Sequence, residues 1–189
     1  GRMGSPTTDE GVCFIEAVRR KYQYNKDRDD LGYDGELKGG AHTGAKQELH
    51  LLTRVFVHDE NIASAGEAGE IAAACAAIEE LDLEGNRFDT WAPVVSIAEQ
   101  LPKLHWLGLN RLRLEAVSAV PEGFAAALGG LRTLCLSHTG LVWDQLLLIA
   151  ASTPALEELH FNGNGVTSLA AAAGAELPLQ RLVTLFVED

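Results

Sequence analysis

The sequence is poor in the residues on which several protein classes depend. Its 189 residues include only three cysteines, Cys13, Cys75 and Cys135, which are widely separated and form no CxxC pair. Neither a disulfide framework nor a zinc ribbon is therefore expected, and a reduced, cytoplasmic setting fits best. Basic residues are also scarce: 15 Lys and Arg against 27 Asp and Glu leave a formal net charge of −12, which is unsuited to binding nucleic acid. No apolar run reaches the roughly 20 residues that a membrane-spanning helix needs.

What is present points to a folded chain with two unlike regions. Hydrophobic residues make up 47% of the sequence, which is enough to bury a core. Residues 1–50 carry eight basic and nine acidic side chains, whereas residues 51–189 carry seven and eighteen. The opening GRMGS resembles a remnant of an expression tag, so residues 1–8 are expected to be a flexible tail.

A leucine-rich pattern repeats along the larger, acidic region. The template L-x-x-L-x-L-x-x-N-x-L fits six times, with steps of 26, 26, 27, 25 and 26 residues. The sixth copy stops with the chain, so about five and a half repeats of a longer array are expected over residues 48–189. The first positions of the copies are Leu52, Ile78, Leu104, Leu131, Leu156 and Leu182.

The template predicts how each repeat folds. Its L-x-L core alternates as a short strand with leucines facing inward, and its Asn position caps the turn that follows. Only Asn86 and Asn164 supply that Asn, while Glu60, Leu112 and Thr139 stand in the other copies. Thr139 can still hydrogen-bond, whereas Leu112 cannot. Helical patterns separate the strands, at residues 67–77, 91–101, 121–128, 143–151 and 168–176.

The fold class that follows is α/β: a leucine-rich-repeat solenoid with a parallel concave sheet of about six strands and helices on the convex side. Residues 9–47 precede it. Residues 9–22 predict an amphipathic helix with a basic C-terminal end, and residues 23–47 a polar, glycine-rich linker. Two interpretations of the helix stay open: a cap on the first repeat, which repeat arrays commonly require, or a basic recognition helix.

The residues capable of chemistry form no recognisable catalytic or metal-binding arrangement. No phosphate-binding loop, dinucleotide-binding or G-x-S-x-G motif is present. The histidines lack the compact spacing of a metal site and favour solvated positions on a binding face. We therefore expect no enzymatic activity, no cofactor and no metal. The six histidines are His42, His50, His58, His105, His138 and His160.

The outward positions of the strands are the candidate site. Three of them hold large aromatic residues, Phe56, Trp106 and Phe186, among carboxylates, a combination typical of protein interfaces. Packing of these aromatics on a neighbouring strand or on the N-terminal segment is the alternative. Cys135 is also outward, as a reactive thiol or a small packing residue. The candidate protein-binding residues are Arg54, Phe56, His58, Glu80, Asp82, Glu84, Trp106, Asn110, Glu158, His160 and Phe186.

Several segments between the repeats resemble the tubulin-folding cofactor E family. The helix GVCFIEAVRRKY at 11–22 is similar to the family's F-x-x-A-[IV]-x-x-[RK]-Y helix, and residues 62–77 to its SxAGExGxxAxxCP stretch, except that Ala77 replaces the proline. Trp91, the run HTGLVW at 138–143 and PALEEL at 154–159 also resemble family signatures. The resemblance covers about residues 11–166.

The resemblance implies a protein-binding domain of a chaperone that handles α-tubulin and the αβ-tubulin heterodimer together with other tubulin-folding cofactors. It implies a cytoplasmic, cytoskeleton-associated protein, and we expect a monomer that binds neither nucleic acid nor membrane. The family's CAP-Gly and ubiquitin-like domains are absent from these residues. A generic leucine-rich-repeat scaffold for an unrelated signalling or regulatory protein is the alternative, and an enzyme is the least favoured hypothesis.

Overall fold

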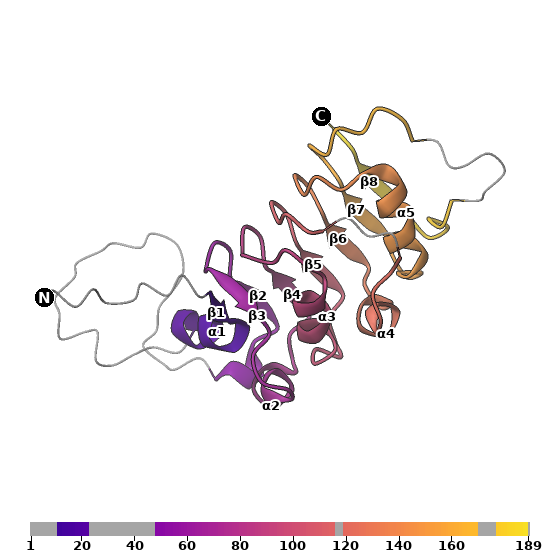
Figure 1. Cartoon of the computed structure of the whole chain (residues 1–189). Helices are drawn as coiled ribbons and strands as arrows, with labels where there is room; N and C mark the ends of the chain where they lie inside the picture. The colour runs from indigo at the N-terminus through magenta and orange to yellow at the C-terminus, as the bar shows by residue number, and fades with distance from the viewer. Residues whose placement is uncertain (1–10, 23–47, 116–118, 170–176, 189) are drawn as a thin grey trace, which may run out of the picture.

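The computed structural model of this chain describes residues 11–22, 48–115, 119–169 and 177–188. The predicted tail over residues 1–8, the linker over residues 23–47 and residues 170–176 of the last predicted helix lie outside these ranges. Within them the chain forms a curved stack of strand-and-helix units, with the N-terminal helix at one end and the last strand at the other (Figure 1).

The strands of the repeats form one parallel sheet. Each strand pairs with the strand of the next repeat, so that Leu81 aligns with Leu107 and Leu107 with Leu134. The repeat period of about 26 residues is thus the length of chain needed to return to the neighbouring strand. The six strands confirm the predicted solenoid. In spatial order they are β2 (Arg54–Phe56), β4 (Glu80–Asp82), β5 (Trp106–Gly108), β6 (Thr133–Cys135), β7 (Glu158–His160) and β8 (Thr184–Phe186).

Helices cover the convex side of this sheet (Figure 1). They are α2 (Glu70–Cys75), α3 (Ala92–Ala98), α4 (Phe124–Leu128) and α5 (Trp143–Ala151). Only α5 has the predicted bounds. The prediction that Pro121 opens a helix is wrong, because α4 begins after Gly123, whose φ of 77° is left-handed and cannot belong to a right-handed helix. Gly69, with φ of 82°, delays α2 in the same way, and the chain is not helical at residues 168–169.

The core lies between the sheet and the helices. The central leucines of the inner strands, such as Leu107 and Leu134, are at most 1% exposed. Trp91, just before α3, packs edge-to-face on Phe124 of α4 with ring centroids 5.3 Å apart. This contact fills the space between two successive repeats with aromatic surface. Among the residues that the structure describes, none of the helices has the length and apolar character required to cross a lipid bilayer.

The N-terminal helix is packed onto the first repeat. It begins later than predicted, as α1 (Phe14–Tyr22), because Val12–Cys13 instead form strand β1, paired in parallel with β3 (Ile62–Ser64). The apolar face of α1, including Phe14, is buried. On its polar side Arg20 binds Glu60 at 2.7 Å, and the hydroxyl of Tyr22 accepts a hydrogen bond from the backbone N–H of Phe56 on the edge strand β2 at 2.9 Å. The helix therefore covers the open edge of the sheet, as the capping interpretation predicts.

An asparagine ties the first two repeats together. The Oδ1 atom of Asn86 accepts hydrogen bonds from the backbone N–H groups of Glu60 and Ile62, at 3.1 and 3.0 Å. Its Nδ2 atom donates to the carbonyls of Val57 and Leu83, at 2.7 and 2.9 Å. The template Asn thus satisfies the turn of the preceding repeat as well as its own.

Asn164 makes equivalent bonds three repeats further along the stack. Its Oδ1 accepts from the N–H groups of Thr139 and Gly140, and its Nδ2 donates to the carbonyls of Leu136 and Phe161. The hydroxyl of Thr139 also donates to the Leu136 carbonyl, at 2.9 Å. Thr139 therefore hydrogen-bonds within the turn of its own repeat, as expected.

Candidate functional site

The sheet register arranges the outward residues into three rows of six across the concave face. Neighbours within a row come from successive repeats, so residues far apart in the sequence lie side by side. The first row is Arg54, Glu80, Trp106, Thr133, Glu158 and Thr184. The second row is Phe56, Asp82, Gly108, Cys135, His160 and Phe186. The third row, just after the strands, is His58, Glu84, Asn110, Ser137, Asn162 and Glu188.

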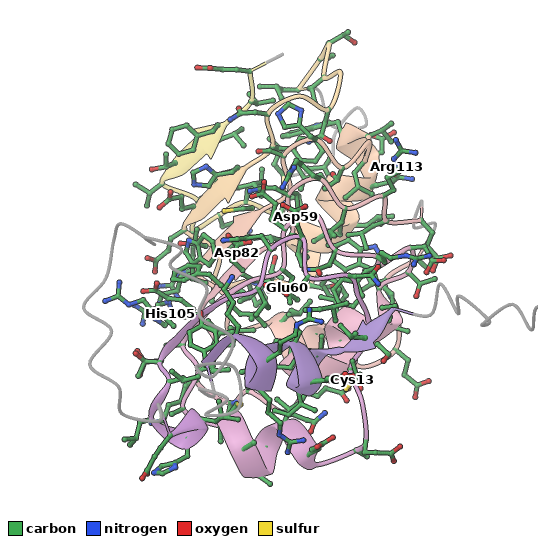
Figure 2. All side chains as sticks on the ribbon, turned by 90° about the vertical axis from the view of Figure 1, so that its left-hand side faces the viewer. Cys13, Asp59, Glu60, Asp82, His105 and Arg113 are labelled. Atoms are coloured by element: carbon green, nitrogen blue, oxygen red, sulfur yellow. The ribbon has the colours of Figure 1, made fainter. Side chains whose placement is uncertain are left out.

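All eleven candidate residues fall on this face, at the outward positions that alternation predicts. The structure describes each of them and places them on one face, on or just after five of its six strands, since β6 contributes none. It does not test their role in binding a protein, which stays a prediction. Figure 2 views the stack from its N-terminal end, with Asp59 and Asp82 labelled.

The aromatic residues at the two ends of the second row are half exposed. Phe56 is 36% exposed and stacks on His58, with ring centroids 6.2 Å apart. Phe186 is 40% exposed and stacks on His160 of the neighbouring strand at 4.4 Å. Each ring therefore packs on a histidine on one side and is exposed on the other. The contact of Phe186 is with a neighbouring strand, as the packing alternative predicts, and a role of the exposed sides in an interface stays a prediction.

Trp106 occupies the centre of the face and is half-buried. A Cβ atom added to Gly108 would lie 2.9 Å from Cη2 of Trp106 and 2.7 Å from Oδ1 of Asp82. The indole therefore extends along its own strand over the glycine and reaches the carboxylate of the neighbouring strand. Gly108 is needed here for the space that it leaves, because any side chain would displace both groups.

The carboxylates of the face have partners of different strength. Arg111 binds Glu84 at 2.6 Å and Asp59 at 2.9 Å, and the hydrogen bonds to Asp59 and Glu84 raise the pKa of the Arg111 guanidinium above its usual value. Asp82 contacts His58 through Oδ2 at 3.2 Å and accepts a hydrogen bond from the backbone N–H of Glu84 at Oδ1, at 3.0 Å. Glu158 bonds to His160 at 2.6 Å, so Glu84 has an arginine as its ion-pair partner, whereas Asp82 and Glu158 are paired with histidines.

Cys135 is a packing residue, the second of the two interpretations. It is 5% exposed. Burial raises the pKa of its thiol to about 12, and the charges of Asp82, Glu158 and Glu84 act in the same direction. The thiol thus stays protonated at neutral pH and is unsuited to nucleophilic chemistry.

The histidines of the face act as hydrogen-bonding groups. His58 and His160 contact carboxylates as described, and the ring of His138 lies where a Cβ on Gly163 would be. His50 contacts Glu48 at 3.2 Å, away from the face. His42 lies outside the described residues. In the part of the chain that the structure describes, no three His, Cys, Asp or Glu side chains are grouped as metal ligands would be.

A row of left-handed residues borders the face, and the sequence reasoning missed it. In five successive repeats the residue five positions after the strand begins has a φ between 55° and 68°. The signal was available, because glycine precedes the template Asn in both Gly85-Asn86 and Gly163-Asn164. Non-glycine residues fill the same position elsewhere, at an energetic cost. The row is Asp59, Gly85, Arg111, His138 and Gly163.

Glycine within this row makes room for an ion pair that spans three repeats. At Gly85 an added Cβ would collide with Oδ1 of Asp59 and lie 3.0 Å from Nη2 of Arg111. The Asp59–Arg111 bond therefore passes directly over Gly85. The sequence could not reveal this, because the two partners are 52 residues apart.

Replacing Gly85 with alanine is expected to lower the free energy of unfolding by about 2 kcal/mol, mostly from the left-handed backbone. The remainder comes from breaking the exposed Asp59–Arg111 pair, whose contribution is small because solvent screens the two charges. Gly140→Ala is the matched control, since its φ is 75° and an added Cβ there meets nothing within 4 Å. Urea titration measures the free energy of unfolding of both variants. Equal losses would show that the ion pair contributes nothing.

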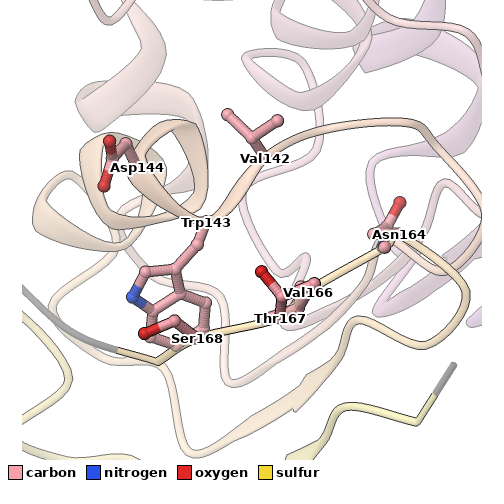
Figure 3. Close-up of a pocket in the computed structure, with 8 residues that line it drawn as sticks. Val142, Trp143, Asp144, Asn164, Val166, Thr167 and Ser168 are labelled. Carbon is pink, nitrogen blue, oxygen red and sulfur yellow. The ribbon is translucent and has the colours of Figure 1, made fainter.

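A shallow depression of about 310 Å³ lies beside the start of α5 (Figure 3). Of the residues that line it, Asp144 alone is ionisable. The depression therefore does not pair two titratable groups in the way that general acid–base catalysis requires. Its described lining consists of Val142, Trp143, Asp144, Asn164, Gly165, Val166, Thr167 and Ser168.

Comparison with known proteins finds relatives over nearly the whole chain. The tubulin-specific chaperone E of Xenopus laevis is 32% identical over 184 residues, which is 95% of this chain and 34% of that protein. The tubulin-specific chaperone E of Mus musculus is 34% identical over 167 residues, or 83% of this chain and 32% of that protein. The chain thus spans about a third of the length of these curated relatives.

No model of a known protein family matches the chain. Among solved structures, an internalin, InlF, of Listeria monocytogenes is 15% identical, with 74% of this chain and 61% of that chain covered and a TM-score of 0.27. A TM-score and a sequence identity this low do not support an inference.

Proposed function

The chain is a relative of the tubulin-specific chaperone E proteins, and we propose that its repeats form the tubulin-binding surface of a tubulin-folding chaperone. The observation that carries this proposal is the similarity of 95% of the chain, including the segments between the repeats, to a protein named for that role. We propose further that the surface handles α-tubulin and the αβ-tubulin heterodimer, together with other tubulin-folding cofactors.

The concave face suits such a role by its shape and composition. It is broad, because six strands contribute three outward positions each. It carries exposed aromatic rings at both ends and an indole at its centre, which are the side chains that contribute most to protein interfaces. The mechanism is noncovalent: the face binds and orients a folding or assembling tubulin subunit, and no bond is made or broken.

The acidic character of the repeats predicts the nature of the contact. A strongly acidic surface binds basic patches on its partner, and such binding weakens as salt screens the charges. We propose that the protein acts in the cytoplasm, associated with the cytoskeleton, as a monomer.

Binding of the purified chain to αβ-tubulin, measured by biolayer interferometry, tests the proposal. Saturable binding that weakens with salt is expected. Trp106→Ala should weaken tubulin binding about tenfold or more. Truncating an aromatic hot-spot residue at the centre of an interface costs about 2 kcal/mol or more. Leu148→Ala is the control, since Leu148 is 37% exposed but lies on the convex helix α5.

Thermal unfolding followed by circular dichroism checks that both variants keep the fold. Failure of the unchanged chain to bind either αβ-tubulin or another tubulin-folding cofactor would favour the generic scaffold instead. Equal affinities of Trp106→Ala and Leu148→Ala for tubulin would remove the concave face from the proposal.

A further inference from the structure

The centre of the concave face presents an indole ring without an aromatic partner. Trp106 takes part in none of the ring contacts formed by the described residues, whereas Phe56 and Phe186 each stack on a histidine. The ring is held over Gly108, where no side chain competes for the space. Tryptophan is the side chain whose π face attracts a cation most strongly.

The carboxylates around this ring lack strong cationic partners. The eighteen outward positions carry five carboxylates and a single arginine, Arg54, at the far end of the first row. Within the described ranges, the ion-pair partners of Asp82 and Glu158 are histidines, His58 and His160. Among the described residues neither carboxylate is paired with an arginine or lysine, whereas Arg111 holds Glu84. The Asp82 side chain is 13% exposed and also accepts a hydrogen bond from the backbone N–H of Glu84.

The thiol of Cys135 gives separate evidence that negative charge gathers near the indole of Trp106. Cys135 is the neighbour of Gly108 in the sheet register. Three carboxylates from two sides of it, Asp82, Glu158 and Glu84, all help to raise the pKa of its thiol. Their fields therefore converge on one point of the face instead of being spread along it.

We propose that this centre binds a lysine or arginine side chain of the partner protein, with the cation against the indole of Trp106 and beside the carboxylate of Asp82, and with Glu158, two strands beyond Trp106, adding its negative charge from the other side. The proposal rests on the protein-binding role proposed above and names the chemistry of the segment that the face recognises. Such a contact combines cation–π attraction with charge-assisted hydrogen bonds. The half-exposed rings of Phe56 and Phe186 then lie on either side, as apolar contacts for flanking residues.

A short basic peptide, acetyl-tetralysine-amide, is the probe for this site. Its binding is followed by calorimetry and by tryptophan fluorescence, which reports on Trp106 because Trp91 and Trp143 are only 1% and 8% exposed. The double variant Asp82→Asn/Glu158→Gln should weaken binding about tenfold, or about 1.4 kcal/mol, because it removes both negative charges that attract the cation. The same peptide with all four lysines acetylated should not bind.

The matched control is Glu99→Gln/Glu122→Gln, which removes the same net charge from exposed positions beside the convex helices α3 and α4. It should change the affinity less than twofold. Trp106→Leu keeps an apolar side chain but removes the π face, and should weaken binding about threefold. Glu158→Gln alone, at a side chain 42% exposed, is the variant least able to disturb the fold.

Equal losses in the two double variants would overturn the proposal, because they would show a long-range charge effect without a local site. No loss in either, or unchanged affinity of Trp106→Leu, would overturn it too. Repeating the comparison with αβ-tubulin separates this inference from the proposed function. Tubulin binding that is equally affected by both double variants defeats the inference alone, whereas peptide binding at the centre without tubulin binding supports the inference and defeats the function.

Discussion

Asn86→Ala is expected to lower the free energy of unfolding by about 4 kcal/mol, because it leaves several buried backbone groups without hydrogen bonds. Asn86 is 7% exposed. Its side chain satisfies the N–H groups of Glu60 and Ile62 and the carbonyls of Val57 and Leu83. Alanine makes none of these bonds and is too small to fill the space that the asparagine side chain leaves. Urea titration followed by tryptophan fluorescence measures the loss from the shift of the midpoint.

Two other asparagines provide graded controls for Asn86. Asn164 makes the same bonds but is only half-buried, so water can replace part of them, and Asn164→Ala should cost about half as much. Asn110, on the concave face, accepts a bond from the N–H of Ser137 and donates a long one, 3.4 Å, to Glu84. Asn110→Ala should cost about 1 kcal/mol or less, because water can replace both bonds on this open face. If the losses at Asn86 and Asn110 were the same, the link between repeats would not be the source of stability.

The repeat period was enough to predict the sheet in detail. Alternation within each L-x-L core gives the side that a residue faces, and equal steps give the register between repeats. Leu81, Leu107 and Leu134 are accordingly aligned and buried. The outward residues, including Trp106, then fall into their rows by the same two rules.

The helices and turns were less predictable, because single glycines decide them. An apolar pattern does not show that Gly69 and Gly123 adopt a left-handed φ and delay α2 and α4. The role of Asn86 was only partly foreseen, since a template describes one repeat and the side chain bonds to two. These features depend on contacts between repeats, which no pattern within one repeat contains.

Side-chain pairing on the concave face could not be predicted from the sequence either. Register places His160 beside Phe186, but the stacking at 4.4 Å depends on the rotamers of both. The extension of Trp106 over Gly108 depends on the absence of a Cβ in the same strand. The sequence identified Trp106, His160 and Phe186 as candidates, and the structure shows how they are grouped.

The N-terminal helix gives the second large expected effect. Phe14→Ala should lower the free energy of unfolding by about 4 kcal/mol, the usual cost of removing a buried phenylalanine from a packed core. Phe14 is fully buried where α1 meets the first repeat. In addition, the amide of Phe56 should exchange hydrogen with solvent faster, because a shifted α1 moves the Tyr22 hydroxyl that accepts its bond.

Arg20→Ala tests the alternative that α1 acts as a basic recognition helix. The ion pair of Arg20 with Glu60 is exposed, and its loss should cost less than about 1 kcal/mol. A recognition helix would give the opposite order: Phe14→Ala would leave the urea midpoint unchanged, and Arg20→Ala would weaken tubulin binding. The capping helix predicts a large loss of stability at Phe14 together with unchanged tubulin binding at Arg20, because α1 then acts by closing the edge of β2 and not by contacting the partner.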